Sequence, residues 1–287
     1  MSKFILSAFA DEIDADFKTQ MDVLERYGIE YIEMRGVNGK GLVEYCLEEV
    51  KEIKKQLDAR NFRISAIGSP LGKIMITDDF KPHLALFNHT LEIARIMETP
   101  YIRMFSFFIP EGEDPAQYRD QVMERWSCFV KAAEGSGLVL LHENEKDIYG
   151  DTAERCLDLI KTMNCDYVRL TFDPANFVQC DVETYPAAFE LLKDHIEYMH
   201  IKDAVYSDHH VVPAGEGDGR VPEILTELYK RGFEGYLSLE PHLGDFVGFG
   251  ALERNAVIPE TVAFGGGVQG FALAVNALKK IISEIER

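Results

Sequence analysis

Four residues at the ends of β-rich runs carry side chains that bind divalent cations. They are Glu143 in LVLLHENE, Asp173 in YVRLTFDPANF, His200 in IEYMHIKDA and Glu240 in GYLSLEPH. The intervals between them are about one βα repeat or a little more, as expected when successive strands of one parallel barrel converge on a common mouth. The sequence therefore predicts one metal site that is built from three carboxylates and one imidazole.

The residue types in this set indicate both the metal and the chemistry. Oxygen-rich sites select hard cations, and one imidazole moves the preference toward transition metals. Mn²⁺ is our first choice, and Mg²⁺, Co²⁺ and Zn²⁺ are the alternatives. Such an ion can chelate a carbonyl and a neighbouring hydroxyl of a sugar and stabilise an enediolate. Glu143 and Glu240 are then expected to act as the acid/base pair on opposite faces of the reacting carbon.

Strands and helices must position these residues. The chain alternates β-rich runs with amphipathic stretches, and this alternation is typical of a βαβ array. Helix-like stretches such as DADFKTQMDVLERYG and EYCLEEVKEIKKQLDAR separate the runs. We predict an α/β fold, a single (β/α)8 TIM barrel, with residues 1–287 as one domain. The eight runs are FILSAF, IEYIEMR, FRISAIGS, YIRMFSFF, LVLLHEN, YVRLTFD, IEYMHIKD and GYLSLEP.

Side-chain alternation along the strands predicts which residues point into the barrel. In YVRLTFD, Asp173 has the opposite phase to the apolar Val168, Leu170 and Phe172. In GYLSLE, Glu240 likewise has the opposite phase to the two leucines. Both acids are therefore expected to face inward at the C-terminal rim, where the active sites of such barrels lie.

Composition restricts the partners and the compartment. The 49 acidic and 30 basic residues give a formal net charge of -19, which repels phosphodiester backbones, so we expect no nucleic-acid partner. The five cysteines form no Cys-x-x-Cys pair, and the N-terminal apolar run meets Asp11 and Glu12 too early for a secretory signal. We expect a cytoplasmic protein with a small-molecule sugar substrate and no membrane partner, and homo-oligomerisation is left open.

The short motifs that carry a resemblance to a known family are Glu143-Asn144-Glu145, Asp173-Pro174-Ala175-Asn176, His200-Ile201-Lys202-Asp203, the glycine-acid run 215–219 and Glu240-Pro241-His242. Through these motifs, nearly the whole chain resembles the sugar phosphate isomerase and epimerase family, which has a xylose-isomerase-like TIM barrel with one domain over residues 1–287 and is distantly related to endonuclease IV. The resemblance implies the same four metal ligands and makes Glu143 and Glu240 the acid/base pair.

Two positions depart from better-defined members of that family. Ketose 3-epimerases of the group have a histidine three residues after the ligand Asp and an arginine six residues after the ligand His, whereas this chain has Asn176 and Tyr206. The departures argue against a free-ketose 3-epimerase. Asn176 also removes one ligand of the multi-zinc cluster of endonuclease IV-type members.

Three further residues are predicted to bind substrate. Glu33 shares a phase with Arg35 at the end of the second strand, Lys202 shares a phase with His200, and Asn176 follows Asp173 in a turn. A buried lysine is equally well explained by a salt bridge to an acid, and Asp-Pro-x-Asn is also ordinary turn chemistry.

The sequence leaves four functions to compare. Metal-dependent isomerisation or epimerisation of a sugar, keto-sugar or sugar phosphate is the first hypothesis. A lyase or dehydratase on a keto-sugar or inosose begins with the same proton abstraction and ends with loss of a β-leaving group. An endonuclease IV-type abasic-site nuclease conflicts with the negative charge, and a barrel kept only for binding conflicts with the presence of all four ligand types.

Overall fold

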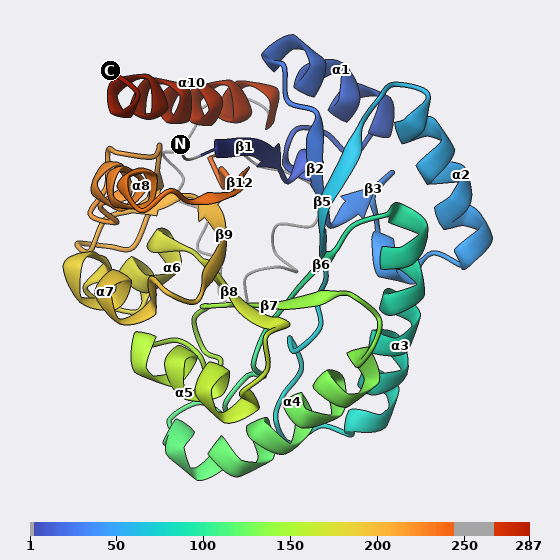
Figure 1. The fold of residues 1–287 in the computed structure, drawn as a ribbon, viewed down its shortest axis with the longest axis vertical. Helices are drawn as coiled ribbons and strands as arrows, with labels where there is room; N and C mark the ends of the chain where they lie inside the picture. Colours follow the sequence, from blue (N-terminus) through green and yellow to red (C-terminus); the bar gives the residue numbers. More distant parts are fainter. Residues whose placement is uncertain (1–2, 244–266) are drawn as a thin grey trace.

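The computed structural model of the protein describes residues 3–243 and 267–287. Eight parallel strands form one sheet that curves into a barrel, and helices surround it (Figure 1). The strand order is β1-β12-β9-β8-β7-β6-β5-β2, and the two terminal strands contact each other, so the barrel nearly closes. The predicted (β/α)8 TIM barrel is confirmed. The barrel strands are β1 (Lys3–Ala8), β2 (Tyr31–Met34), β5 (Arg63–Gly68), β6 (Tyr101–Met104), β7 (Val139–Glu143), β8 (Val168–Phe172), β9 (Ile196–Ile201) and β12 (Glu234–Leu239).

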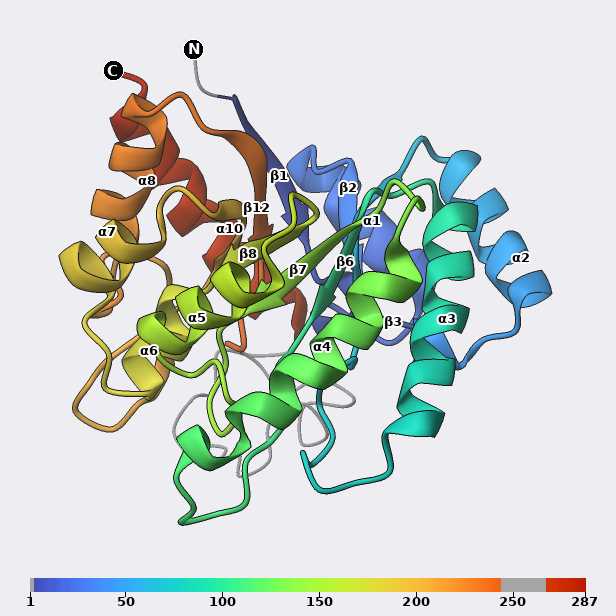
Figure 2. The same cartoon turned by 60° about the horizontal axis from the view of Figure 1, so that its bottom comes forward.

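The helices lie outside the strands, and α2, α3, α4 and α5 follow one another around the barrel (Figures 1 and 2). Short 3-10 turns are found at η1 (Ala10–Glu12), η2 (Leu42–Glu44) and η3 (Pro115–Tyr118), and a π-turn at η4 (Thr184–Ala188). The helices are α1 (Phe17–Tyr27), α2 (Leu47–Asp58), α3 (Phe80–Met97), α4 (Arg119–Ala133), α5 (Ala153–Met163), α6 (Pro174–Gln179), α7 (Phe189–Leu192), α8 (Val221–Lys230) and α10 (Gly267–Ile285).

Local sequence signals set the ends of these helices. Asp16 caps α1 by accepting a hydrogen bond from the Thr19 amide, and Gly28 ends it in the left-handed conformation with φ of 67°. Thr152 caps α5 in the same way through the Arg155 amide. Side-chain oxygens satisfy amides that a helix start leaves without a partner, and glycine adopts a left-handed end at little cost.

The apolar core has two layers that match the predicted strand phases. The outward side chains of the strands, among them Leu170, Phe172 and Leu237, pack with the helices in one large cluster. The inward side chains form a separate cluster around Ala66, Leu141 and Tyr198 inside the barrel. The two-residue period of a strand produces this separation. Along β9, the next inward residue after Tyr198 toward the carboxyl end is His200.

Two small hairpins extend the barrel beyond the carboxyl ends of its strands. The first pairs β3 (Gly36–Val37) with β4 (Lys40–Gly41) after β2, and the second pairs β10 (Asp203–Ala204) with β11 (Val211–Val212) after β9. Both hairpins therefore belong to the end of the barrel at which active sites lie. Among the described residues, no helix combines the length and the apolar character needed to cross a membrane.

Candidate functional site

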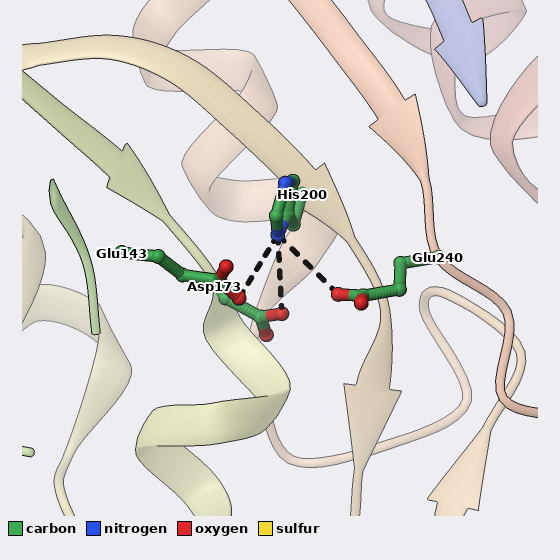
Figure 3. A group of neighbouring side chains, drawn as sticks. All are labelled: Glu143, Asp173, His200 and Glu240. Carbon is green, nitrogen blue, oxygen red and sulfur yellow. Dashed lines mark hydrogen bonds and ion pairs between the residues drawn. The ribbon is translucent and has the colours of Figure 1, made fainter. Parts of the chain in front are cut away.

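Glu143, Asp173, His200 and Glu240 converge at the carboxyl ends of β7, β8, β9 and β12 (Figure 3). One potential ligand atom from each residue lies within 4.8 Å of the others, and all four side chains are buried. Nδ1 of His200 lies 3.0 Å from Glu143 Oε1, 3.3 Å from Glu240 Oε2 and 3.8 Å from Asp173 Oδ2. The structure thus brings together the four residues that the sequence singled out, which we call the quartet.

The strand register accounts for this convergence. His200 pairs with Ser238 across β9 and β12, so Glu240 projects inward two residues further along. Glu143 pairs with Thr171, and Asp173 follows two residues later on the same face. Because neighbouring strands are parallel, their ends reach one rim, and the alternation of side chains aims all four groups at the barrel axis.

Asp173 has a second role as the N-cap of α6. Its Oδ1 accepts a hydrogen bond of 3.0 Å from the Asn176 amide, whereas its Oδ2 points to the quartet and lies 3.2 Å from Lys202 Nζ. Pro174 at the first helical position fits this helix start because its nitrogen has no hydrogen to donate. The helix start therefore fixes the carboxylate and leaves one oxygen for the site.

Two asparagines hold Glu143 and Asp173 of the quartet in place. Asn144 donates from Nδ2 to the Asp173 carbonyl and accepts at Oδ1 from the Asp173 amide, each at 2.9 Å. Asn176 donates from Nδ2 to Glu143 Oε1 at 3.1 Å. Both asparagines are buried. Asn176, which was predicted to contact the substrate, thus forms a hydrogen bond with Glu143, one of the predicted metal ligands.

Glu33, the second predicted substrate contact, lies on the far side of His200 from the quartet. Its two carboxylate oxygens lie 3.0 and 3.2 Å from His200 Nε2, and its side chain is fully buried. Arg103 of β6 lies beside it, with Nε 3.6 Å from Glu33 Oε1 and 3.2 Å from Glu143 Oε2. The sequence analysis did not single out Arg103, although an arginine within the mostly apolar predicted run YIRMFSFF was a usable signal.

Lys202, the third predicted substrate contact, reaches the quartet from one inward position beyond His200. Its Nζ lies 3.2 Å from both Asp173 Oδ2 and Glu240 Oε2, and the residue is 3% exposed. A salt bridge to acids of the site, the alternative that the sequence left open, is therefore present. Substrate binding by Lys202 stays a prediction.

The pKa values of the quartet residues are set by burial and by the charges that face them. Burial alone would lower the pKa of His200, but Glu143, Glu33 and Glu240 together raise that pKa well above its ordinary value. Burial raises the pKa of Asp173 to about 7, with further contributions from Glu240 and Glu143. Burial also opposes ionisation of Glu240, yet Lys202 and His200 hold its pKa well below the ordinary value. The site therefore requires cationic charge among its acids.

The donor set fits a divalent cation. Three carboxylates and one imidazole match an oxygen-rich site for Mn²⁺ or a related ion. Oε2 of Glu143 and Oδ2 of Asp173 are buried and accept no hydrogen bond from the described residues, although each lies 3.2 Å from a cationic side chain. Buried acceptors without a hydrogen bond are uncommon in folded proteins, and a metal ion would satisfy both.

A second acidic group adjoins the quartet and is held by Arg35. This guanidinium donates two hydrogen bonds to Asp11, at 2.9 and 3.0 Å, and lies 3.1 Å from Glu12 Oε1 and 3.2 Å from Glu240 Oε1. Ligand atoms of Glu12, Glu240 and His242 also approach one another. This second group offers three potential ligand residues, one fewer than the quartet, and it shares Glu240 with the quartet.

The glycine-acid run 215–219 wraps around the carboxylate of Asp203. Asp203 accepts hydrogen bonds from the amides of Gly215, Gly217 and Gly219 at 2.9, 3.2 and 2.8 Å. A Cβ at Gly217 or Gly219 would lie 2.4 or 2.6 Å from Asp203 Oδ1, so only glycine fits at these two positions. The HIKD motif and the glycine run are therefore two halves of one structural unit beside His200.

A cavity of about 510 Å³ opens next to the quartet, and Glu143 and Glu240 form part of its wall. Its other walls come from the β3–β4 hairpin and from the segment after β5 that carries Lys73. A second cavity, of about 660 Å³, lies at the opposite end of the barrel around Tyr31 and Arg60. The smaller cavity is the candidate substrate site because it adjoins the quartet at the carboxyl ends of the strands.

Comparisons with known proteins agree with this architecture. Residues 21–265 match the family model described as xylose isomerase-like TIM barrel, and no curated protein sequence matches the chain. A structure of the IOLI protein with a bound zinc atom superimposes with a TM-score of 0.74, at 17% identity over 99% of both chains. D-psicose 3-epimerase, determined in the presence of D-fructose, gives a TM-score of 0.72 at 17% identity over 96% of this chain and 97% of that one. The probable 3-DHS dehydratase AsbF from Bacillus anthracis gives 0.68 at 17% identity, over 97% and 99%.

Proposed function

The chain belongs to the xylose isomerase-like TIM barrel family, and from this premise we propose that it is a divalent-metal-dependent isomerase or epimerase. The substrate is a sugar, keto-sugar or sugar phosphate, and the reaction proceeds through an enediolate. The observation that carries the proposal is the convergence of Glu143, Asp173, His200 and Glu240 into one buried group beside a cavity.

The quartet would hold the metal ion, and Mn²⁺ remains our first choice for the reason given by its donor types. When bound, the ion polarises the substrate carbonyl and stabilises the negative charge that develops on its oxygen. A hydrogen bond from His200 Nε2–H to Glu33 would leave the Nδ1 lone pair directed at the quartet. Such an arrangement of a carboxylate behind a ligating histidine fixes both its tautomer and its orientation.

Glu143 and Glu240 serve as the acid/base pair. They come from different strands and approach the centre of the quartet from opposite sides (Figure 3). One carboxylate removes the proton next to the substrate carbonyl, and the other delivers a proton to the opposite face or to the neighbouring carbon. The first outcome is epimerisation and the second is isomerisation. A positioned base or acid of this kind typically contributes about 10²–10⁴-fold to the rate.

The remaining polar residues divide by their positions. Lys202 carries a fixed positive charge at the quartet, and we propose that it donates a hydrogen bond to a substrate oxygen. Glu33 and Asn176 lie behind His200 and Glu143, so they act on the substrate through these two residues. This assignment gives Glu33 and Asn176 a positioning role instead of the direct contact predicted from the sequence.

Metal analysis combined with isotope exchange tests the proposal. The purified protein is analysed for bound Mn, Mg, Co and Zn, and the metal-loaded and chelator-treated forms are then incubated with keto-sugars and their phosphates in D₂O. We expect metal-dependent incorporation of deuterium next to the carbonyl, which is detected by NMR. Protein that binds no divalent metal at the quartet, or that is loaded with metal and exchanges no proton of any keto-sugar, contradicts the proposal.

A lyase or dehydratase reaction is the second candidate. It uses the same proton abstraction, and the Lys202 ammonium beside Glu240 is placed to protonate a β-leaving group. The same incubations distinguish the two reactions because elimination releases water or an aglycone and leaves an unsaturated product. An isomerase or epimerase returns a product of unchanged composition.

A further inference from the structure

The two carboxylate oxygens of Glu240 have different partners. Oε2 lies 3.3 Å from His200 Nδ1 and 3.2 Å from Lys202 Nζ, and Figure 3 shows this contact with His200. Oε1 instead accepts a hydrogen bond of 3.2 Å from Arg35 Nη1 and lies 3.5 Å from His242 Nε2. The side chains of Arg35 and Glu240 are 9% and 6% exposed, so solvent weakens their contact less than it weakens a surface pair. Glu240 thus contacts His200 of the quartet through Oε2, while Arg35 binds Oε1.

The guanidinium of Arg35 is itself held in one orientation. Its Nε and Nη2 donate hydrogen bonds to the two oxygens of Asp11 at 2.9 and 3.0 Å, and Nη2 also donates to Glu12 Oε1 at 3.1 Å. Its Cζ lies over the Phe9 ring, 4.4 Å from the ring centre. A planar guanidinium that binds a carboxylate through two nitrogens and packs on a ring cannot rotate without breaking these contacts. These contacts therefore direct Nη1 at Glu240.

Three strand ends bring this group together. Asp11 and Glu12 lie in η1 after β1, Arg35 follows β2, and Glu240 follows β12. Because β1 pairs with β12 and contacts β2, the three ends are neighbours at the carboxyl end of the barrel. Gly36 leaves room for the Asp11 carboxylate, since a Cβ at this position would lie 2.9 Å from Asp11 Oδ2. The backbone next to Arg35 therefore allows Asp11 to approach and orient it.

Asp173 shows the same division of its oxygens by a different means. Its Oδ1 accepts a hydrogen bond from the Asn176 amide, and its Oδ2 lies 3.8 Å from His200 Nδ1. The start of α6 supplies that donor from three residues away, whereas Glu240 receives its donor from Arg35, 205 residues away. A carboxylate can bind a cation through one oxygen or through both. In both residues the protein donor favours binding through one oxygen.

We propose that Arg35 is a positioning residue that restricts Glu240 to binding the ion through Oε2 alone. The inference rests on the proposed function and adds a residue to its site. A carboxylate that binds through both oxygens occupies one more coordination position than a carboxylate that binds through one. Arg35 therefore preserves a position on the ion for an oxygen of the substrate or of the solvent. Loss of Arg35 removes the hydrogen bond that keeps Oε1 from the ion.

Mn²⁺ binding by the Arg35→Met variant tests the inference without a substrate. Competition with a chelator measures the affinity, and water-proton relaxation reports the exchangeable water on the bound ion. We expect Mn²⁺ to bind as tightly as in the wild type or more tightly, because Oε1 becomes available and a neighbouring cation is lost. The relaxation should fall, because Oε1 displaces water. A residue that only stabilises the fold would instead lower the affinity and leave the relaxation of the bound ion unchanged.

Two further variants separate the hydrogen bond from the charge and from general effects of losing an arginine. Arg35→Lys keeps the charge and one donor group, so it should recover part of the lost relaxation. Arg60→Met is the matched control, because Arg60 also bridges two acids, Asp22 and Glu25, at 2.8 and 2.7 Å, and lies over the Phe62 ring. Arg60 lines the cavity at the opposite end of the barrel. Its variant should keep the wild-type affinity and relaxation.

Deuterium exchange at saturating Mn²⁺ supplies the functional readout. We expect the exchange rate of Arg35→Met to fall by about tenfold or more, because an ion that loses a coordination position orients the substrate less well. Arg35→Lys should recover part of the rate, and Arg60→Met should exchange at the wild-type rate. Activity would thus fall while metal affinity holds or rises.

The double variant Asp11→Asn/Arg35→Met keeps the inference testable if Arg35→Met fails to fold. It removes one buried acid together with the cation, so fewer buried charges remain unpaired, and the same results are expected. Unchanged relaxation, or weaker Mn²⁺ binding, in the folded variants that lack Arg35 overturns the inference. Wild-type protein that binds no Mn²⁺ overturns both the inference and the proposed function. Wild-type protein that binds Mn²⁺ but exchanges no deuterium contradicts the proposed function alone, since affinity and relaxation still decide the role of Arg35.

Discussion

The two ends of the barrel interior differ in the kind of polar group that they bury. At the N-terminal end, which we call the floor, neutral hydroxyls and tyrosines fill the space. Ser7, Ser65 and Tyr198 form a hydrogen-bonded chain with distances of 2.6 and 2.8 Å, and Tyr101 and Tyr236 pack edge-on around it. At the C-terminal end, the mouth, the quartet and its paired cations fill the space.

Single strands carry both environments, two residues apart. Along β9, Tyr198 belongs to the floor and His200 to the mouth, and along β7 Leu141 and Glu143 are divided in the same way. Burying charged groups costs free energy even when they are paired, whereas the hydrogen-bonded hydroxyls of Ser7, Ser65 and Tyr198 in the floor carry no charge. We therefore expect that the neutral floor mainly contributes stability and that the charged mouth mainly serves the proposed chemistry. The following predictions test this division.

Removal of the proposed acid/base groups should have the largest effect. Glu143→Gln and Glu240→Gln keep the side-chain shape but cannot accept the substrate proton, so we expect the rate of deuterium exchange to fall by about 10²–10⁴-fold. The control, Glu197→Gln, makes the same change at the floor end of β9, where Glu197 accepts a hydrogen bond from Tyr101, and should exchange at the wild-type rate. Activity lost equally in all three variants would contradict the division.

Thermal stability without metal sharpens the test. Lys202 and His200 hold the pKa of Glu240 well below its ordinary value, so Glu240→Gln breaks buried ion pairs and should lower the melting midpoint. Burial raises the pKa of Asp173 to about 7, so Asp173→Asn removes a charge that the folded protein holds at a cost, and its midpoint at pH 8 should lie at or above that of the wild type. Circular dichroism measures the midpoint. A loss of many degrees in Asp173→Asn would show that this carboxylate stabilises the fold.

Glu33 lies between the two environments and should show an intermediate effect. Glu33→Gln keeps the volume but weakens the carboxylate that holds His200 Nε2, and loss of such a partner typically lowers metal affinity by about 10–100-fold. Competition with a chromogenic chelator measures the affinity. We expect kcat at saturating metal to fall less than in Glu240→Gln, and Glu33→Asp to recover part of the affinity. If metal affinity is unchanged in Glu33→Gln, Glu33 does not orient His200 for metal binding and belongs with the residues of the floor.

The sequence predicted those parts of the molecule that depend on local patterns. Strand alternation gave the inward phase of Asp173 and Glu240, and the quartet followed from residue type at four strand ends. The pairing of Arg103 with Glu143 was not predicted, because it joins residues 40 positions apart through strand register. Asp203 and the glycine run were each noticed, but no local rule states that a loop several residues later will enclose that carboxylate.

The stability of the fold at low pH should depend on His83, a buried histidine outside the mouth. His83 packs among Phe80, Phe107 and Phe129, and its Nε2 accepts a hydrogen bond from the Gly72 amide. Burial lowers its pKa from 6.5 to about 4. Below pH 6.5 the unfolded chain therefore binds a proton that the folded protein does not, and stability falls as the pH drops toward 4.

The loss that His83 causes by pH 5.5 should be on the order of 1 kcal/mol. Thermal melts between pH 8 and pH 5 of the wild type and of His83→Gln measure it. Glutamine can still accept from the Gly72 amide but does not titrate in this range, so its melting temperature should decline less steeply below pH 6.5. Parallel declines in the two proteins would show that His83 does not control this part of the pH dependence.

The smallest expected effect concerns the floor itself. Tyr198→Phe removes the hydroxyl that bonds to Ser65 and keeps the ring that packs under His200 at a centroid distance of 6.0 Å. The Ser7–Ser65 hydrogen bond remains, so the loss should be about 1 kcal/mol, the net value of one buried hydrogen bond. The melting temperature should fall by a few degrees, while metal affinity and deuterium exchange remain within about twofold of wild type, since no charge in the mouth has changed. If exchange falls as far as in Glu33→Gln, the floor takes part in orienting the quartet, and the interior must then be treated as one hydrogen-bonded unit.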